Sequence, residues 1–126
     1  MTAERLAHAN DLIQLIANHG RKFFNSNGHV AKMHLDSRGR VWFHDARTGK
    51  LIYTHYSGKW KAFSHGGTLR SLVERLRDYV NKGVQLPPSI ICPERCNVDD
   101  GNIWGYEESE AKKLRAACQG LPIFRD

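Results

Sequence analysis

The sequence predicts an α+β fold in a single domain, residues 1–126, and three features of its hydrophobic pattern support that prediction. Apolar residues recur at helical spacing near both ends of the chain and again over residues 68–81. Between residues 29 and 63 they alternate with polar residues, and a glycine interrupts the alternation at each expected turn. Helices and a run of strands that occupy separate stretches of one chain are typical of this fold class.

The first predicted element is an N-terminal helix over residues 3–18. His19 and Gly20 mark its end, because glycine readily adopts the left-handed conformation that closes a helix. The apolar stripe of this helix comprises Leu6, Leu12, Ile13, Leu15, Ile16 and Ala17.

The second predicted element is a four-stranded antiparallel meander. The alternation of residues 29–35 predicts its first strand, and the turn DSRGR places Gly39 where a positive φ angle is needed. The strand VWFHD, the turn ARTGK with Gly49 and the strand LIYTH follow. The turn YSGK and the strand WKAF complete the sheet, which Phe23 and Phe24 could extend.

An amphipathic helix packed on the sheet is predicted for residues 68–81, with Thr68 as its N-cap and Gly83 as its stop. Residues 85–102 have no sustained period and predict a long crossing segment. A C-terminal helix over residues 107–118 follows. The apolar stripe of the middle helix is Leu69, Leu72, Val73, Leu76, Tyr79 and Val80, and that of the last helix is Ala111, Leu114, Ala117 and Cys118.

Positive charge is concentrated in the middle of the chain. Residues 21–77 contain 12 lysines and arginines against three acids, although the whole chain has a net charge of only +6. This layout predicts a polyanionic partner or an acidic protein surface, and its alternative is a basic domain without such a partner. No stretch has the length and apolarity of a membrane helix or the plan of a secretory signal, and the three cysteines do not suggest a disulfide framework. We therefore expect no membrane contact and a cytoplasmic location.

The first candidate for a binding surface is the sheet face opposite the amphipathic helix. Alternation along the strands predicts that cations, histidines and aromatic rings gather on this outer face. Single-stranded nucleic-acid binders combine rings that stack on bases with cations that follow the backbone. The alternative is that the N-terminal helix or the C-terminal segment covers the rings. The predicted outer face comprises Lys32, His34, Arg40, Trp42, His44, Tyr53, His55, Lys59 and Lys61.

The second candidate is the stretch SHGGT at the start of the middle helix. Its glycines permit positive φ angles, and the free amides of a helix N-terminus attract anions. A tight strand-to-helix turn would need the same glycines, and the stretch lacks the spacing of a Walker loop. The residues of the predicted anion site are His65, Gly66, Gly67, Thr68 and Arg70.

Metal binding and catalysis are less favoured. Cys92, Cys96 and Cys118 lack the paired spacing of a structural zinc site, and we expect no metal and no cofactor. His34, His44 and His55 could meet on neighbouring strands and serve a small metal-independent nuclease as acid and base. No nucleophile motif or carboxylate pair accompanies them.

Trp104 and Tyr106 flank Gly105 just before the last helix. As core residues they would hold that helix to the body of the protein. As an exposed pair they would form a protein-binding hot spot, because tryptophan and tyrosine dominate such sites.

The segments RGRVWFHDARTGKLIY, WKAFSHGGTLRSLVERLRDYV and IWGYEE resemble short uncharacterised proteins encoded by phages, prophages and other mobile elements. The resemblance extends over residues 5–123 and supplies no catalytic or binding residues. It implies an accessory role, directed at a host or defence component. The residues themselves favour non-catalytic binding of nucleic acid or a nucleoprotein through the outer face. The alternatives are a protein–protein inhibitor or adaptor and a small nuclease.

Overall fold

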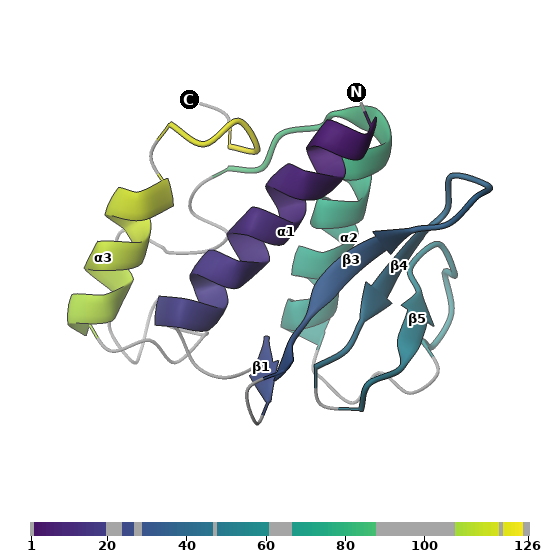
Figure 1. The fold of residues 1–126 in the computed structure, drawn as a ribbon, viewed down its shortest axis with the longest axis horizontal. Coiled ribbons are helices and arrows are strands. Elements are labelled where there is room, and N and C mark those ends of the chain that lie inside the picture. Colours follow the sequence, from purple (N-terminus) through teal and green to yellow (C-terminus); the bar gives the residue numbers. More distant parts are fainter. Residues whose placement is uncertain are drawn as a thin grey trace.

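The computed structural model describes residues 2–19, 24–26, 29–46, 48–60, 67–87, 108–118 and 120–124. It has an α+β fold, as the sequence predicts (Figure 1). The helices are α1 (Thr2–His19), α2 (Gly67–Lys82) and α3 (Glu108–Cys118). The strands are β1 (Asn25–Ser26), β2 (His29–Val30), β3 (Lys32–Leu35), β4 (Val41–His44) and β5 (Leu51–Tyr53).

The main sheet consists of β3, β4 and β5 in that order, all antiparallel to their neighbours. Its inward residues are in register, with Met33 opposite Phe43 and Phe43 opposite Ile52. Two glycines in the left-handed region close the hairpins, Gly39 at φ 78° and Gly49 at φ 71°. The predicted positive φ angles at both turns are therefore confirmed.

The predicted four-stranded meander is wrong at its N-terminal end. Residues 29–35 divide at Ala31, so that β2 pairs with β1 in a separate two-stranded sheet. The expected strand WKAF does not start at Trp60, whose ring is 3% exposed and donates its Nε1 hydrogen to the Tyr56 carbonyl at 2.8 Å. This bond closes residues 56–60 into a loop anchored by the buried indole. The rest of WKAF lies outside the described residues.

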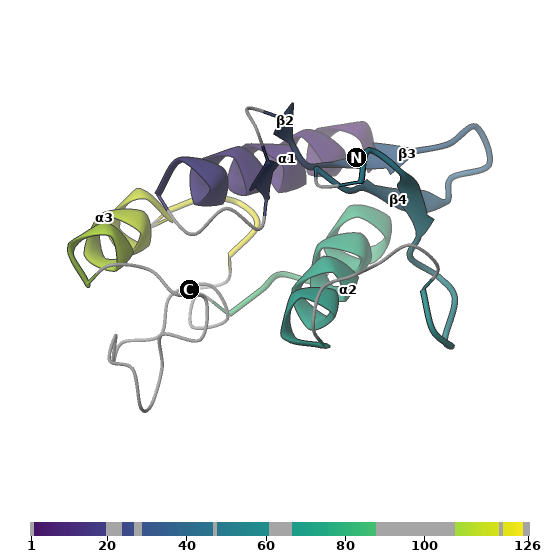
Figure 2. The ribbon, with the colours of Figure 1, turned by 90° about the horizontal axis from the view of Figure 1, so that it is seen from below.

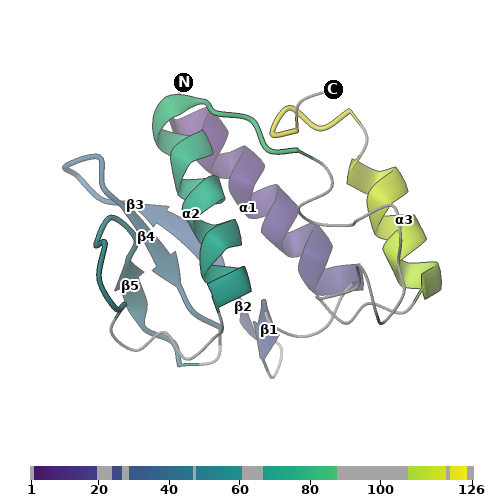
Figure 3. The same ribbon diagram turned by 180° about the vertical axis from the view of Figure 1, so that it is seen from behind.

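The two longest helices lie against the sheet in different ways. α2 covers one face of the sheet, as seen from behind in Figure 3, and α1 runs beside β3 (Figure 2). Phe43 and Ile52 of the sheet are buried in one cluster with Ile13 of α1 and with Leu72 and Leu76 of α2. None of the described helices crosses the opposite face of the sheet, which points toward the viewer in Figure 1.

α1 also occupies the outer edge of β3. The Asn10 side chain donates to the Met33 carbonyl at 3.1 Å and accepts the Met33 N–H at 2.6 Å. The amide thus supplies the two hydrogen bonds that a further strand would make, which prevents β3 from pairing with another chain at this point.

The boundaries of the other helices agree closely with the sequence. α2 begins at Gly67, so that Thr68 is a helical residue and not the N-cap. Gly83 follows its last residue as predicted, with a φ of 75° and an N–H bonded to the Tyr79 carbonyl at 2.9 Å. α3 packs against α1 on the side away from the sheet (Figure 1). In α3, Leu114 is buried as predicted, whereas Ala117 is exposed.

Candidate nucleic-acid interface

Strand register assembles the core of the predicted outer face. Across β3 and β4, Lys32 lies opposite His44 and His34 opposite Trp42. Trp42 in turn lies opposite Tyr53 on β5. Lys32 and His34 are exposed, and the other three side chains are half-buried. The five residues therefore share one face, and none of the described helices lies over it (Figure 1).

Asp36 organises one end of this face. Its Oδ2 accepts the Trp42 indole N–H at 2.9 Å and the Arg40 Nε hydrogen at 2.8 Å, while its Oδ1 accepts the backbone N–H groups of Arg38 and Arg40. The bond from Trp42 is the largest of the effects that hold the pKa of Asp36 well below its usual range, followed by those from Arg40 and Arg38. The carboxylate fixes the plane of the indole and the position of the guanidinium.

The aromatic side chains form a row across the strands. The rings of Trp42 and Tyr53 have centroids 5.0 Å apart and are tilted by 53°, and the His55 ring follows 5.5 Å from Tyr53. The Arg40 guanidinium carbon lies 6.0 Å from the Trp42 ring centroid and 5.8 Å from that of Tyr53. These distances are within the range of cation–π attraction, so the cation and the rings stabilise one another.

An open pocket of about 340 Å³ continues this row at the β5 end of the outer face. Tyr56, which is 57% exposed, and Leu51, which is 52% exposed, stand at its rim. The Tyr56 ring rests on the chain at Gly58, where an added Cβ would lie 2.7 Å from Tyr56 Cε2. The pocket is lined by Trp42, Leu51, Ile52, Tyr53, Tyr56, Lys59 and Trp60.

Arg70, from the predicted anion site, supports the wall of this pocket. Its guanidinium carbon lies 4.4 Å from the Trp60 ring centroid, and its Nη2 donates to the carbonyls of Tyr56 and Ser57. Glu74 lies 3.9 Å from its Nε. Arg70 is therefore engaged with the loop of residues 56–60.

The three histidines of the outer face have different surroundings. His55 Nε2 accepts the Val41 N–H at 3.1 Å, which requires that nitrogen to be unprotonated. Burial, and next the charge of Arg77, lower the pKa of His55. His44 has a buried Nδ1 without a hydrogen-bond partner among the described residues, and His34 is exposed. His55 thus has a backbone-binding role that differs from the role expected of a nuclease acid.

A family model named YoqU matches residues 1–123 of the chain. The chain belongs to the YoqU family. The name is of the type given to genes of Bacillus phages, which agrees with the phage association implied by the sequence resemblance. No curated protein and no solved structure matches the chain.

Membership in the YoqU family assigns no site residues, so each remaining prediction depends on the structure alone. Among the described residues, no group of histidines, cysteines or acids could hold a metal, and no helix is long and apolar enough to cross a bilayer. Cys118 is buried. The predicted site residues that lie outside the described residues are Lys61, His65, Gly66, Cys92, Cys96, Trp104 and Tyr106.

Three residues of the site were missed from the sequence. Asp36 looked like a turn residue, although an aspartate followed by arginine and tryptophan at i+4 and i+6 could have indicated the shared carboxylate. Leu51 looked like an ordinary strand residue, yet it lies on the outer face opposite His44. Tyr56 looked like part of a turn, and no local pattern indicates that its ring is held over Gly58.

Proposed function

We propose that this YoqU-family protein is a non-catalytic binding protein that engages nucleic acid, free or in a nucleoprotein, through the outer face of its sheet. The observation that carries the proposal is the aromatic pocket at the β5 end of that face. Trp42, Tyr53 and Tyr56 line it, and the exposed Lys59 stands beside them.

The pocket suits an unpaired base better than a duplex. A base within a duplex has both of its faces stacked, whereas a base in a single strand can place one face against an aromatic ring. Tyr56 is the most exposed ring of the pocket, and its edge packs against the backbone at Gly58. A ring that is already ordered loses little conformational entropy when a base stacks on it.

Charge around the pocket favours a phosphate backbone. The described part of residues 29–60 has exposed cations at Lys32, Arg38, Lys50 and Lys59. Of the acids in the same part, Asp36 is paired with Arg40 and Asp45 is buried. The accessible charge on this side of the molecule is therefore positive, which attracts a polyanion and makes the attraction dependent on salt.

Binding of a fluorescently labelled single-stranded 12-mer, followed by anisotropy, tests the proposal. Tyr56→Ala should weaken binding by about 1–3 kcal/mol, the usual loss for one base–aromatic stack. Tyr56→Phe retains the ring and should bind like the wild type. Gly58→Ala changes none of the proposed binding residues but forces the Tyr56 ring to move, so it should also weaken binding.

A duplex of the same sequence provides the comparison. We expect it to bind more weakly than the single strand, and its affinity should not change in Tyr56→Ala. Equal affinity of the Tyr56→Ala and wild-type proteins for the single strand would contradict the use of this pocket.

The same pocket supports a second candidate function, that of a protein–protein inhibitor or adaptor that acts on a host or defence protein during phage growth. Leu51 and Tyr56 are both more than half exposed beside an apolar cavity, and such residues can anchor a protein interface. A pull-down from host lysate with and without nuclease treatment separates the two functions. Capture that survives nuclease and is lost in Leu51→Asp favours the protein partner.

A further inference from the structure

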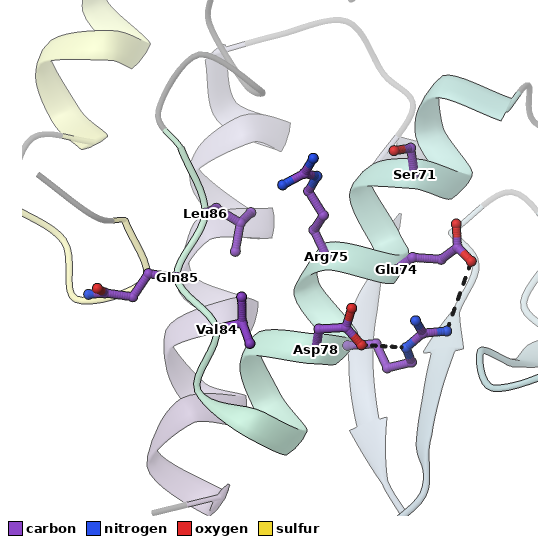
Figure 4. Close-up of a pocket in the computed structure, with 8 residues that line it drawn as sticks. Ser71, Glu74, Arg75, Asp78, Val84, Gln85 and Leu86 are labelled. Carbon is purple, nitrogen blue, oxygen red and sulfur yellow. Dashed lines mark hydrogen bonds and ion pairs between the residues drawn. The ribbon is translucent and has the colours of Figure 1, made fainter.

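A second pocket lies between α2 and the segment that follows it. Its volume is about 350 Å³. One wall is the solvent side of α2, which contributes Ser71 and Arg75, and the other wall contains Val84 and Leu86 (Figure 4). The complete lining is Ser71, Glu74, Arg75, Arg77, Asp78, Val84, Gln85 and Leu86.

The walls of this pocket are held by backbone bonds. The chain reverses at Gly83, whose N–H is bonded to the Tyr79 carbonyl at 2.9 Å. The Leu86 N–H bonds to the Ile123 carbonyl at 2.9 Å, and the Gln85 amide turns away from the pocket to donate to the Pro122 carbonyl at 2.9 Å. The segment therefore cannot close onto α2 without losing these bonds, which keeps the pocket open.

The charged side chains of the pocket are unequally paired. Arg77 Nε lies 3.0 Å from Asp78 Oδ1, and Arg77 Nη1 lies 4.0 Å from Glu74 Oε2. In Figure 4 both carboxylates point toward these partners, while the Arg75 guanidinium extends alone into the space between the walls. Arg75 has no hydrogen bond or ion pair with any described residue, so its charge is the uncompensated one in the pocket.

We propose that this pocket binds a small organic monoanion, with its carboxylate on Arg75 and its apolar part against Val84. A guanidinium presents a planar pair of N–H donors that matches a carboxylate. Val84 is 56% exposed, and an apolar group placed on it would remove that surface from water. The volume is at the lower end of the range for small-molecule sites, which is roughly 300–1,000 Å³.

The acids of the pocket limit the charge of the ligand. Arg75 and Arg77 balance Glu74 and Asp78, so the lining has no net charge before the ligand binds. A monoanion can be attracted to Arg75 while staying apart from the two paired carboxylates. A dianion such as a phosphate monoester would be repelled by the same carboxylates. This feature separates the pocket from the polyanion-binding surface proposed for the sheet.

Titration of the full-length ¹⁵N-labelled protein with three probes, followed by NMR, tests the proposal. Benzoate carries both the charge and the apolar group, benzamide is its neutral counterpart, and acetate lacks the ring. Benzoate should shift the amides of residues 71–78 and 83–86 and bind about tenfold or more tightly than either other probe. Benzamide lacks the charge-assisted hydrogen bonds to Arg75, which are the stronger kind, and acetate lacks the apolar ring that Val84 would cover. Inorganic phosphate should not shift these amides.

Arg75→Gln should remove the benzoate response, whereas Lys82→Gln, which deletes an exposed charge at the end of the same helix, should retain it. Both side chains are exposed, so the spectra should otherwise stay like those of the wild type. Equal shifts with benzoate and benzamide, an unchanged response in Arg75→Gln, or shifts confined to the outer face of the sheet would overturn the proposal.

Discussion

Asp36 connects the hairpin turn to the aromatic row, since its two oxygens hold Trp42, Arg40 and the turn backbone at once. Its pKa is lowered in the folded protein, chiefly by the bond from Trp42. A carboxylate of this kind stabilises the fold at any pH above its unfolded pKa of about 3.9, and the contribution is lost as the pH falls through the acidic range.

Asp36→Asn should therefore lower the melting temperature at pH 7, because the amide that replaces one oxygen cannot accept from Trp42 and Arg40. The gap between variant and wild type should begin to narrow between pH 4 and 3, where Asp36 of the unfolded wild-type chain takes up a proton while the folded carboxylate is still ionised. Melting curves at pH 7, 5, 4 and 3 measure this. Asp11→Asn, an exposed change on α1, is the control. A gap of constant size over this pH range would show that Asp36 does not act through its charge.

His55 predicts a pH dependence in a different range. Its pKa is lowered, first by burial, and its neutral Nε2 accepts the Val41 N–H. His55 takes up a proton at a higher pH in the unfolded chain than in the folded protein. The free energy of unfolding should therefore decrease as the pH falls below about 6.5. His55→Gln should lose less stability than the wild type between pH 7.5 and 5.5 in urea unfolding. Equal losses in the two proteins would show that His55 titrates alike in both states.

At the scale of elements, α1 protects the open edge of β3 through the side chain of Asn10. Asn10→Ala would leave the Met33 N–H and carbonyl without these partners, and we expect a loss of about 1–3 kcal/mol in the free energy of unfolding. Gln14→Ala removes an exposed bond to Asn18 on the same helix and should change stability by less than about 0.5 kcal/mol. Similar losses for the two variants would contradict the importance of this edge contact.

The hairpin between β3 and β4 depends on the backbone conformation of Gly39. An added Cβ would meet no atom within 4 Å, so any cost comes from the positive φ angle. Gly39→Ala should destabilise the protein by about 1–2 kcal/mol, and Gly39→Asn by less, because asparagine tolerates this conformation better. Urea unfolding of the three proteins checks the order. Alanine as stable as asparagine would show that the turn relaxes to a different geometry.

The sequence was sufficient for those elements that local chemistry specifies. Glycines in the turns, the period of two and the stripe of α2 predicted β3, β4, β5 and the middle helix. The sequence alone could not show that Trp60 lies outside a strand, because Trp60 at an alternating position has the same pattern whether it pairs in a sheet or anchors a loop. The decision depends on its bond to Tyr56 and on Arg70, which lies ten residues further along the chain.

The candidate site was predictable to the same extent. Alternation alone placed Trp42, His44 and Tyr53 on one face, since side-chain direction follows from strand register. The pocket beside them was not predictable, because it depends on where the loop of residues 56–60 folds back. The sequence also does not show that Glu74 and Asp78 pair with Arg77 and not with Arg75. That choice depends on contacts between side chains, which the spacing of residues along a helix does not determine.

At the scale of the whole molecule, the fold separates its two proposed binding regions. The sheet presents cations and rings on the face that α2 leaves open, and the monoanion pocket lies on the solvent side of α2 (Figures 1 and 4). The two regions also differ in charge. The outer face of the sheet has a surplus of cations, whereas the lining of the pocket has equal numbers of cations and acids, with Arg75 set apart from the paired ones. Ligands of the two regions should therefore bind independently.

The measurement that tests the central claim most directly is the salt dependence of single-strand binding by the wild type and by two matched charge reversals. If the backbone makes three or four contacts with the outer face, the logarithm of affinity should fall with the logarithm of salt at a slope of about −2 to −3. Lys59→Glu, beside the aromatic pocket, should weaken binding and flatten the slope, and Lys82→Glu, at the end of α2, should leave the slope nearly unchanged. No binding by the wild type at low salt, or equal effects of the two reversals, would contradict a nucleic-acid interface on this face.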